Sequence, residues 1–173
     1  VAHRAFDFLH RVGDEPFVLG VAFDEPHGPF VAPPRYWEKF SPADIPRRPN
    51  TLAPLGDKPR LHHLQRSEGR EATWEHYAAR ATRFFGCNSY IDGQIGRVID
   101  AVDKLHARDT VIIYTSDHGD QRLSHGLRGK GAMMYEESCN VPLIVRWPDG
   151  PRGQVTGAVA SHVDLLPTML DLA

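Results

Sequence analysis

The sequence has only two cysteines, a net charge close to zero and no long apolar run. Two cysteines allow at most one disulfide, which excludes a scaffold held together by several disulfides. The 20 basic and 22 acidic side chains give a formal net charge of −2, a field too weak to attract nucleic acid by itself. No stretch reaches the ~18 apolar residues typical of a membrane-spanning helix. We therefore expect no nucleic-acid partner and no membrane span.

What is present is the composition of a folded, globular chain. Of its 173 residues, 41% are hydrophobic and 24% are charged, which argues against disorder and fits about one domain. The chain starts at Val1 without methionine or signal peptide, and a helical pattern over Ala2–Val12 begins at once. Because chains seldom begin inside a helix, we expect an internal fragment of a longer protein. The localisation is therefore left open.

Apolar and periodic segments alternate along the sequence in the manner of strands and helices. Strands are predicted at 17–23, 110–115 and 141–147, and further helices at 67–105, 133–137 and 165–172. The first strand is almost continuously apolar, as in strands buried on both faces of a parallel sheet. This order predicts an α/β fold. Before the last helix, Ser161 and Asp164 have the spacing of a capping box.

A proline-rich segment, Asp24 to Arg66, separates the first strand from the long helix. It holds nine of the 14 prolines and shows no lasting period. A stretch of this length without regular structure is usually functional or disordered. Its aromatic residues favour an ordered loop that lies on a core, and a floppy linker is the alternative. These aromatic residues are Phe30, Tyr36, Trp37 and Phe40.

Asp117 and His118 directly follow the strand at 110–115. In open α/β sheets, ligands bind just beyond the carboxyl ends of the strands. A carboxylate and an imidazole at that position are suitable metal ligands, with a second carboxylate nearby at Asp120. Two ligands cannot hold a metal ion tightly, so further ligands must come from elsewhere. The simpler alternative is that Asp117 caps a turn and His118 lies on the surface.

Lys130 and His27 strengthen the metal and anion interpretation. Lys130 is one of only four lysines, against 16 arginines, and its compact ammonium suits a tetrahedral anion. Glycines at 126, 129 and 131 let the backbone approach such an anion closely. His27 follows the first predicted strand, within Pro-His-Gly-Pro-Phe. Three motifs at strand ends therefore predict one site for an anion and a metal.

Several stretches, in this order, resemble the sulfatase family within the alkaline phosphatase superfamily. They are 16–23 with 26–33, 90–100, 115–120 with His125, Gly126 and Lys130, 137–145, and 161–167. Together they cover nearly the whole chain. The resemblance implies the C-terminal part of a sulfatase catalytic domain over residues 1–173. The fold would be part of an alkaline-phosphatase-like α/β sandwich with a mostly parallel central sheet.

The family implies a divalent-metal site, usually calcium, with Asp117 and His118 as two ligands. Many relatives carry Asn at the position of His118, and a histidine nitrogen makes manganese or another transition ion an alternative to Ca²⁺. Lys130 would hold a sulfate oxygen and the developing negative charge. His27 would contact the sulfate or donate a proton to the departing oxygen. His125 and Arg128 would lie near the pocket, with no step assigned.

The nucleophile of the family is absent from this chain. Family members use a formylglycine made from cysteine, or serine in a variant, within Cys-x-Pro-x-Arg. Cys87 and Cys139 both lack the proline and arginine at those offsets, so we expect both to be buried and inert. Formylglycine and the remaining metal carboxylates are expected in an N-terminal part outside this chain. The fragment alone is expected to be inactive.

The expected reaction of the complete protein is hydrolysis of a small-molecule or carbohydrate sulfate ester. One alternative is a phosphonate or phosphate ester hydrolase of the same superfamily. Another is a non-catalytic binding module that keeps the fold. Because strands without neighbours leave open edges and apolar surface, we also expect the fragment to self-associate.

Overall fold

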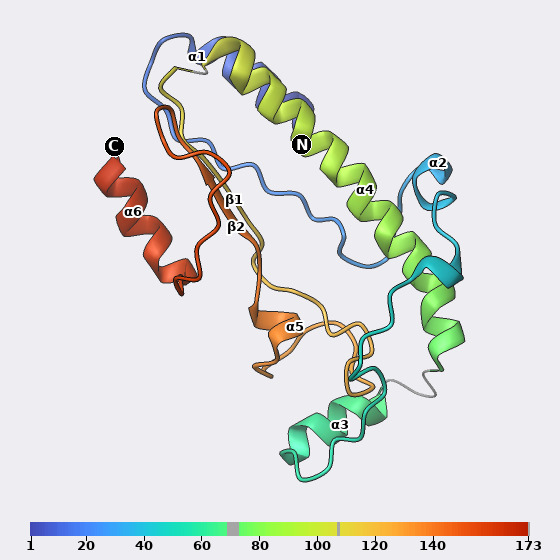
Figure 1. Cartoon of the computed structure of the whole chain (residues 1–173). Coiled ribbons are helices and arrows are strands. Elements are labelled where there is room, and N and C mark those ends of the chain that lie inside the picture. Colours follow the sequence, from blue (N-terminus) through green and yellow to red (C-terminus); the bar gives the residue numbers. More distant parts are fainter. Residues whose placement is uncertain (69–72, 107, 173) are drawn as a thin grey trace.

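The computed structural model describes residues 1–68, 73–106 and 108–172. The elements in chain order are α1 (Ala2–Val12), α2 (Pro34–Trp37), η1 (Pro42–Asp44), α3 (Arg60–Glu68), α4 (Trp74–Leu105), β1 (Ile112–Thr115), α5 (Glu136–Cys139), β2 (Leu143–Arg146), η2 (His162–Asp164) and α6 (Leu165–Leu172). Figure 1 shows α4 as the long axis, with α1 beside it and α6 on the far side of the two strands. Helices and strands alternate, as expected for an α/β chain.

The 32-residue helix α4 is the support on which the other elements pack. Thr73 caps its first turn by accepting a hydrogen bond from the His76 backbone N–H at 3.3 Å. Against its C-terminal half lies α1, which buries Ala5 and Leu9. The His106 ring donates to the Leu9 carbonyl at 3.0 Å. The helix predicted over 67–105 is therefore confirmed from Trp74 onward, and residues 69–72 lie outside the described part.

The proline-rich segment is ordered, as its aromatic residues predicted. It contains α2, η1 and α3, and its rings pack edge-on or tilted against those of α4. The centroid distances are 5.4 Å for Phe30–Phe84, 5.2 Å for Tyr36–Tyr90 and 5.7 Å for Phe40–Phe85. Each such pair stabilises the fold by about 0.5–1.5 kcal/mol beyond its buried area. The alternative of a floppy linker is wrong for this segment.

Gly86 lets the segment reach the surface of α4. A Cβ at Gly86 would lie 2.6 Å from the Trp37 Cα and 2.9 Å from its backbone nitrogen. Only glycine allows this approach between two backbones. The Arg83 guanidinium covers the Trp37 ring from α4 at 4.5 Å, which fixes α2 at the same point.

The sheet is smaller than predicted. β1 and β2 pair antiparallel, from Ile112 opposite Arg146 to Thr115 opposite Leu143, so the mostly parallel sheet is not seen in the described residues. The strand predicted at 17–23 is wrong: these residues form no strand, and Val18 is 85% exposed. An apolar run forms a strand only where a neighbouring strand satisfies its N–H and C=O groups.

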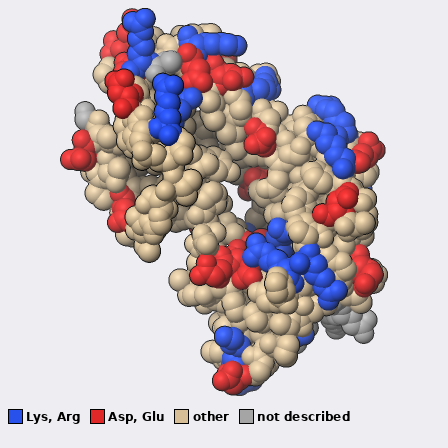
Figure 2. All heavy atoms as spheres, viewed as in Figure 1, with Lys and Arg blue, Asp and Glu red and all other residues tan. Residues whose placement is uncertain are grey.

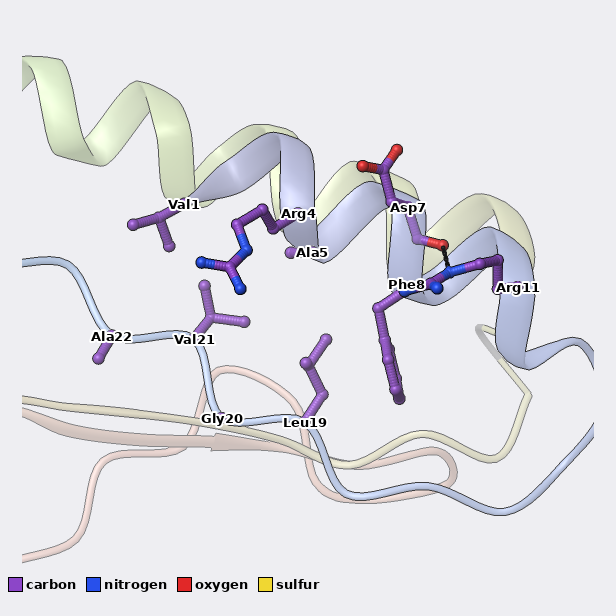
Figure 3. Close-up of a pocket in the computed structure, with 10 residues that line it drawn as sticks. All are labelled: Val1, Arg4, Ala5, Asp7, Phe8, Arg11, Leu19, Gly20, Val21 and Ala22. Carbon is purple, nitrogen blue, oxygen red and sulfur yellow. Dashed lines mark hydrogen bonds between the residues drawn. The ribbon is translucent and has the colours of Figure 1, made fainter.

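A hollow of about 550 Å³ lies between α1 and residues 19–22. In Figure 3, Arg4 and Phe8 extend from α1 toward Val21 and Leu19 on the unpaired segment. None of the predicted site residues lines this hollow. The hollow therefore lies beside residues 17–23 and is separate from the predicted active site.

The C-terminal third leaves much apolar surface exposed. In β2, Ile144 is 60% exposed, and in α6 Leu166 is 61% and Leu170 is 70% exposed. Figure 2 shows a deep hollow on this face between the part that carries α6 and the part that carries α4. Within the described residues, no helix has the length and apolar character needed to cross a membrane. The predicted capping box of Ser161 and Asp164 is confirmed at the start of η2.

We expect Gly86→Ala to lower the free energy of unfolding of the full-length protein by about 1–3 kcal/mol, because the added methyl collides with backbone. Gly93→Ala is the matched control in the same helix, since its Cβ would meet nothing within 4 Å. That change should stabilise by up to ~1 kcal/mol. Urea unfolding followed by tryptophan fluorescence measures both, and equal midpoints for the two variants would contradict the predicted collision.

The isolated chain should self-associate, because the edges of β1 and β2 and the exposed leucines of α6 have no cover. Size-exclusion chromatography with light scattering measures the mass. A single monomeric species across micromolar concentrations would show that this apolar surface does not drive association.

Candidate functional site

Asp117 and His118 form a tight turn directly after β1. The Asp117 Oδ1 accepts the His118 backbone N–H at 2.9 Å. Ser116 Oγ donates to the His118 carbonyl at 2.9 Å. The His118 ring nitrogen Nδ1 lies 2.8 Å from the Gly119 carbonyl and must carry the proton, since a carbonyl only accepts. In the neutral ring, Nε2 is then the nitrogen that carries the lone pair.

The two remaining donor atoms of this turn lie together. Asp117 Oδ2 and His118 Nε2 are 3.4 Å apart, and their side chains are 83% and 39% exposed. Two ligands at about 2.1–2.4 Å from one ion, with bonds near a right angle, lie about 3.0–3.4 Å apart. The pair therefore fits two adjacent positions around a divalent ion. Among the described residues no group of three or more metal-binding side chains forms, so other ligands would have to complete the site.

Gly119 fixes the turn against the segment that leads into β2. Its backbone N–H donates to the Ser138 carbonyl at 2.9 Å. A Cβ at Gly119 would collide with the Glu137 carbonyl oxygen and lie 3.0 Å from its carbon. The Asp117–His118 turn is thus held on α5 as well as on β1.

The Asp120 carboxylate is influenced by the charges of several residues of the predicted site. Burial raises the pKa of Asp120, and this rise is opposed by the Arg122 backbone N–H and by the charges of Arg122, Lys130 and His118. The Gln121 backbone N–H, next to Asp120, donates to the Gly129 carbonyl, next to Lys130, at 2.7 Å. Figure 2 shows basic and acidic side chains side by side over the region of α5 and its loops. The structure brings Asp117, His118 and Lys130 to the same region.

Lys130 is presented by a tightly wound loop, 121–131. Three residues other than glycine have left-handed backbone, namely Arg122, Leu123 and His125. Such conformations cost of order 1 kcal/mol or more each and persist only where surrounding contacts impose them. Here the Leu123 backbone N–H donates to the Leu127 carbonyl at 2.8 Å, and both leucine side chains are completely buried.

Glu137 ties this loop to the proline-rich segment. Its Oε1 accepts hydrogen bonds from Asn50 Nδ2 at 2.7 Å and Ser124 Oγ at 2.8 Å, and lies 3.4 Å from an Arg48 nitrogen. The Glu137 side chain is 6% exposed. Burial alone would raise the pKa of Glu137, but these hydrogen bonds and the Arg48 charge lower it below its ordinary value. Glu137 is therefore a buried, ionised anchor.

His27 belongs to the proline-rich segment that packs on α4. Its ring Nδ1 donates to the Gly28 carbonyl at 2.8 Å, and the side chain is exposed. Phe30, three residues on, packs on Phe84, whose ring centroid lies 5.5 Å from the Arg122 guanidinium. The proline-rich segment and loop 121–131 thus both pack on the Phe84 ring of α4. Within the described residues, no hydrogen bond, ion pair or ring contact joins His27 to Asp117, His118 or Lys130. The role of His27 therefore stays a prediction.

The cysteines were predicted only in part, and two structural polar residues were not predicted at all. Cys87 is buried as expected, but Cys139 is exposed, so the expectation of two buried thiols is wrong for Cys139. The reason is that the short helix α5 turns this position outward. Sequence reasoning gave no structural role to Asn50 or Gln65. Each acts through partners more than 60 positions away, and neither lies in a local motif that could have revealed it.

Comparison with known proteins identifies the class to which this fold and site belong. The phosphonate monoester hydrolase of Silicibacter pomeroyi superposes with a TM-score of 0.84 at 27% identity, over 97% of this chain and 36% of that one. The chain therefore has an alkaline-phosphatase-like α/β fold. The family model described as Sulfatase matches residues 1–173. The chain belongs to the sulfatase family.

Two curated relatives agree with this family. The chain is 41% identical to a sulfatase of Escherichia coli K12, over 100% of this chain and 35% of the relative. It is 32% identical to a multifunctional alkaline phosphatase superfamily protein of Trinickia caryophylli, over 97% of this chain and 36% of the relative. The chain thus spans about a third of the length of the curated relatives it matches.

Stability should depend on pH through Glu137. Because its folded pKa lies below the ordinary value of 4.5, the ionised group stabilises the fold above about that pH, and this contribution is lost as the pH falls through the folded pKa. Glu137→Gln should therefore destabilise the full-length protein by about 1–3 kcal/mol at neutral pH. The difference from wild type should shrink at lower pH.

Urea titrations at several pH values between neutrality and about 3 test this dependence. Glu136→Gln is the matched control, because Glu136 is exposed and accepts only a surface bond from Asn140 at 3.1 Å. It should change stability by less than about 0.5 kcal/mol. A Glu137→Gln effect that stays constant with pH would contradict the ionised anchor.

Proposed function

We propose that the full-length protein hydrolyses a sulfate ester to an alcohol and sulfate, with this chain supplying part of the active site. The observation that carries the proposal is the placement of Asp117 Oδ2 and His118 Nε2 3.4 Å apart at the end of β1. The hydrogen bond of 2.7 Å from the Gln121 backbone N–H to the Gly129 carbonyl holds the segment with Lys130 beside Asp120. Membership of the sulfatase family supports the choice of reaction.

Asp117 and His118 would hold a divalent metal ion. The hydrogen bond from His118 Nδ1 to the Gly119 carbonyl orients the ring and leaves Nε2 basic, as is usual for histidine ligands. The carboxylate oxygen suits Ca²⁺, and the imidazole nitrogen makes Mn²⁺ the alternative. When bound, such an ion would stabilise negative charge on the reacting ester.

Lys130 and His27 would act on the sulfate and on the leaving group. The Lys130 ammonium would hold a sulfate oxygen as a point charge. The His27 Nδ1 proton is engaged by the Gly28 carbonyl, so His27 can donate a proton from Nε2 only when the ring is doubly protonated. His27 would then serve as general acid toward the departing oxygen.

The nucleophile is proposed to be a formylglycine in the part of the protein that this chain does not span. Cys87 is completely buried in α4, and desolvation raises the pKa of its thiol, which disfavours the reactive thiolate. Cys139 lies on α5, outside any Cys-x-Pro-x-Arg pattern. The residues of this chain would bind, orient and neutralise charge, and the chain alone would not turn over substrate.

A second candidate is hydrolysis of a phosphonate or phosphate ester at the same site. The similarity to a phosphonate monoester hydrolase, with a TM-score of 0.84, supports this candidate. Sulfate and phosphonate monoesters are both tetrahedral anions, so the Lys130 ammonium and a divalent ion suit either. The ester preference would depend on residues outside this chain.

The decisive experiment compares an aryl sulfate with an aryl phosphonate monoester on the full-length protein. We expect faster turnover of the sulfate, and loss of activity by a factor of ~100 or more in Lys130→Ala, because an electrostatic contact to the reacting group is lost. Preference for the phosphonate would overturn the sulfatase assignment and favour the second candidate.

Metal analysis of purified full-length protein tests the ligand pair. Asp117→Ala should lower the bound metal content and the activity together. Asp92→Ala is the matched control, since Asp92 is exposed on α4. Absence of both metal and activity in the wild type, with Asp117→Ala unchanged, would instead identify a non-catalytic binding module.

A further inference from the structure

Lys130 lies between two glycines, so the backbone on either side of it has little conformational preference. Gly129 has a left-handed φ of 64°, and Gly131 follows directly. Glycine allows a wide range of backbone angles. A side chain that must hold an anion at one place needs its backbone direction to be fixed by other groups.

Two hydrogen bonds fix the peptide groups on either side of Lys130. The Gln121 backbone N–H donates to the Gly129 carbonyl at 2.7 Å. The Gln65 side-chain Nε2 donates to the Lys130 carbonyl at 3.0 Å. The first bond lies within loop 121–131, whereas the second comes from α3, in the proline-rich segment.

Gly131 makes room for the Gln65 amide. A Cβ at Gly131 would lie 2.9 Å from Gln65 Oε1 and 3.0 Å from Nε2. Gly131 has no left-handed φ, so its backbone does not itself require glycine. Because glycine has no side chain, Gly131 instead leaves room for the close contact with the Gln65 amide.

Helix α3 is held on the loop at two further points, which keeps the Gln65 amide in place. Arg66 lies across Gly126, where a Cβ would come within 2.8 Å of the Arg66 Nε. His62, one turn earlier, shares a hydrogen bond of 2.8 Å with the Tyr135 hydroxyl. His62, Gln65 and Arg66 of α3 therefore contact loop 121–131 or Tyr135, which follows it.

From these contacts we propose that Gln65 is a positioning residue for Lys130, which sets the direction of the lysine by holding its carbonyl. The inference rests on the anion-binding role proposed for Lys130. Gln65 itself touches neither substrate nor metal.

The test uses the full-length protein and measures the dissociation constant of inorganic sulfate by titration calorimetry. Gln65→Ala should weaken sulfate binding by about five- to tenfold, as expected for loss of a hydrogen bond that orients a charged group. Gln94→Ala is the matched control, because Gln94 is also half-buried and its amide oxygen accepts a hydrogen bond from Arg97 at 3.0 Å. That control should bind sulfate like the wild type.

Gln65→Glu separates the hydrogen bond from simple packing. Glutamate has the same shape, but an ionised carboxylate has no proton to donate to the Lys130 carbonyl. If Gln65 positions Lys130, this variant should also weaken sulfate binding. Wild-type affinity in Gln65→Glu would show that Gln65 only fills space, and would overturn the inference.

A double-mutant cycle with Lys130→Ala completes the test. In the Lys130→Ala background, Gln65→Ala should cause no further loss of sulfate affinity, because the residue through which it acts is gone. An equal loss in both backgrounds would overturn the inference. If Lys130→Ala itself leaves sulfate binding unchanged, the proposed function of Lys130 fails, which is a separate and distinguishable outcome.

Discussion

The contact on which the rest of the structure depends is made by two adjacent rings in the N-terminal half of α4, Phe84 and Phe85. The proline-rich segment packs on them through Phe30 and Phe40. The Arg122 guanidinium lies 4.7 Å from the Phe85 centroid and 5.5 Å from that of Phe84. Arg122 also donates to the Tyr77 hydroxyl at 3.0 Å, so the segment with His27 and the loop with Lys130 share one support.

Features carried by local patterns were predictable from the sequence. The periodicity of α1 and most of α4, the β-branched run of β1 and the capping box before α6 all depend on neighbouring residues. The absence of a strand at 17–23 was not predictable, because pairing requires a partner strand and Val18 has none among the described residues. The exposure of Cys139 depends on the orientation of α5, which no local pattern encodes.

The same division applies to the candidate site. Asp117, His118 and Lys130 stand out because their residue types and their positions after a strand carry chemical meaning. Glu137 and Gln65 have no such recognisable meaning in the sequence alone. The role of a buried carboxylate or of an amide becomes clear only when its hydrogen-bond partners are known. Their partners, Asn50 and the Lys130 carbonyl, lie 87 and 65 positions away in the sequence. The sulfatase family model matches residues 1–173, whereas the contacts show how the chain holds the proposed site residues.

The long sequence separation of these contacts has a consequence for the order of folding. Helix α4 is built from local contacts and can form early, but the lysine loop needs hydrogen bonds to residues 50 and 65 for its left-handed backbone. Closing loops of that length is slow compared with helix formation. We therefore expect loop 121–131, which carries Lys130, to assemble last, after the proline-rich segment has docked on α4.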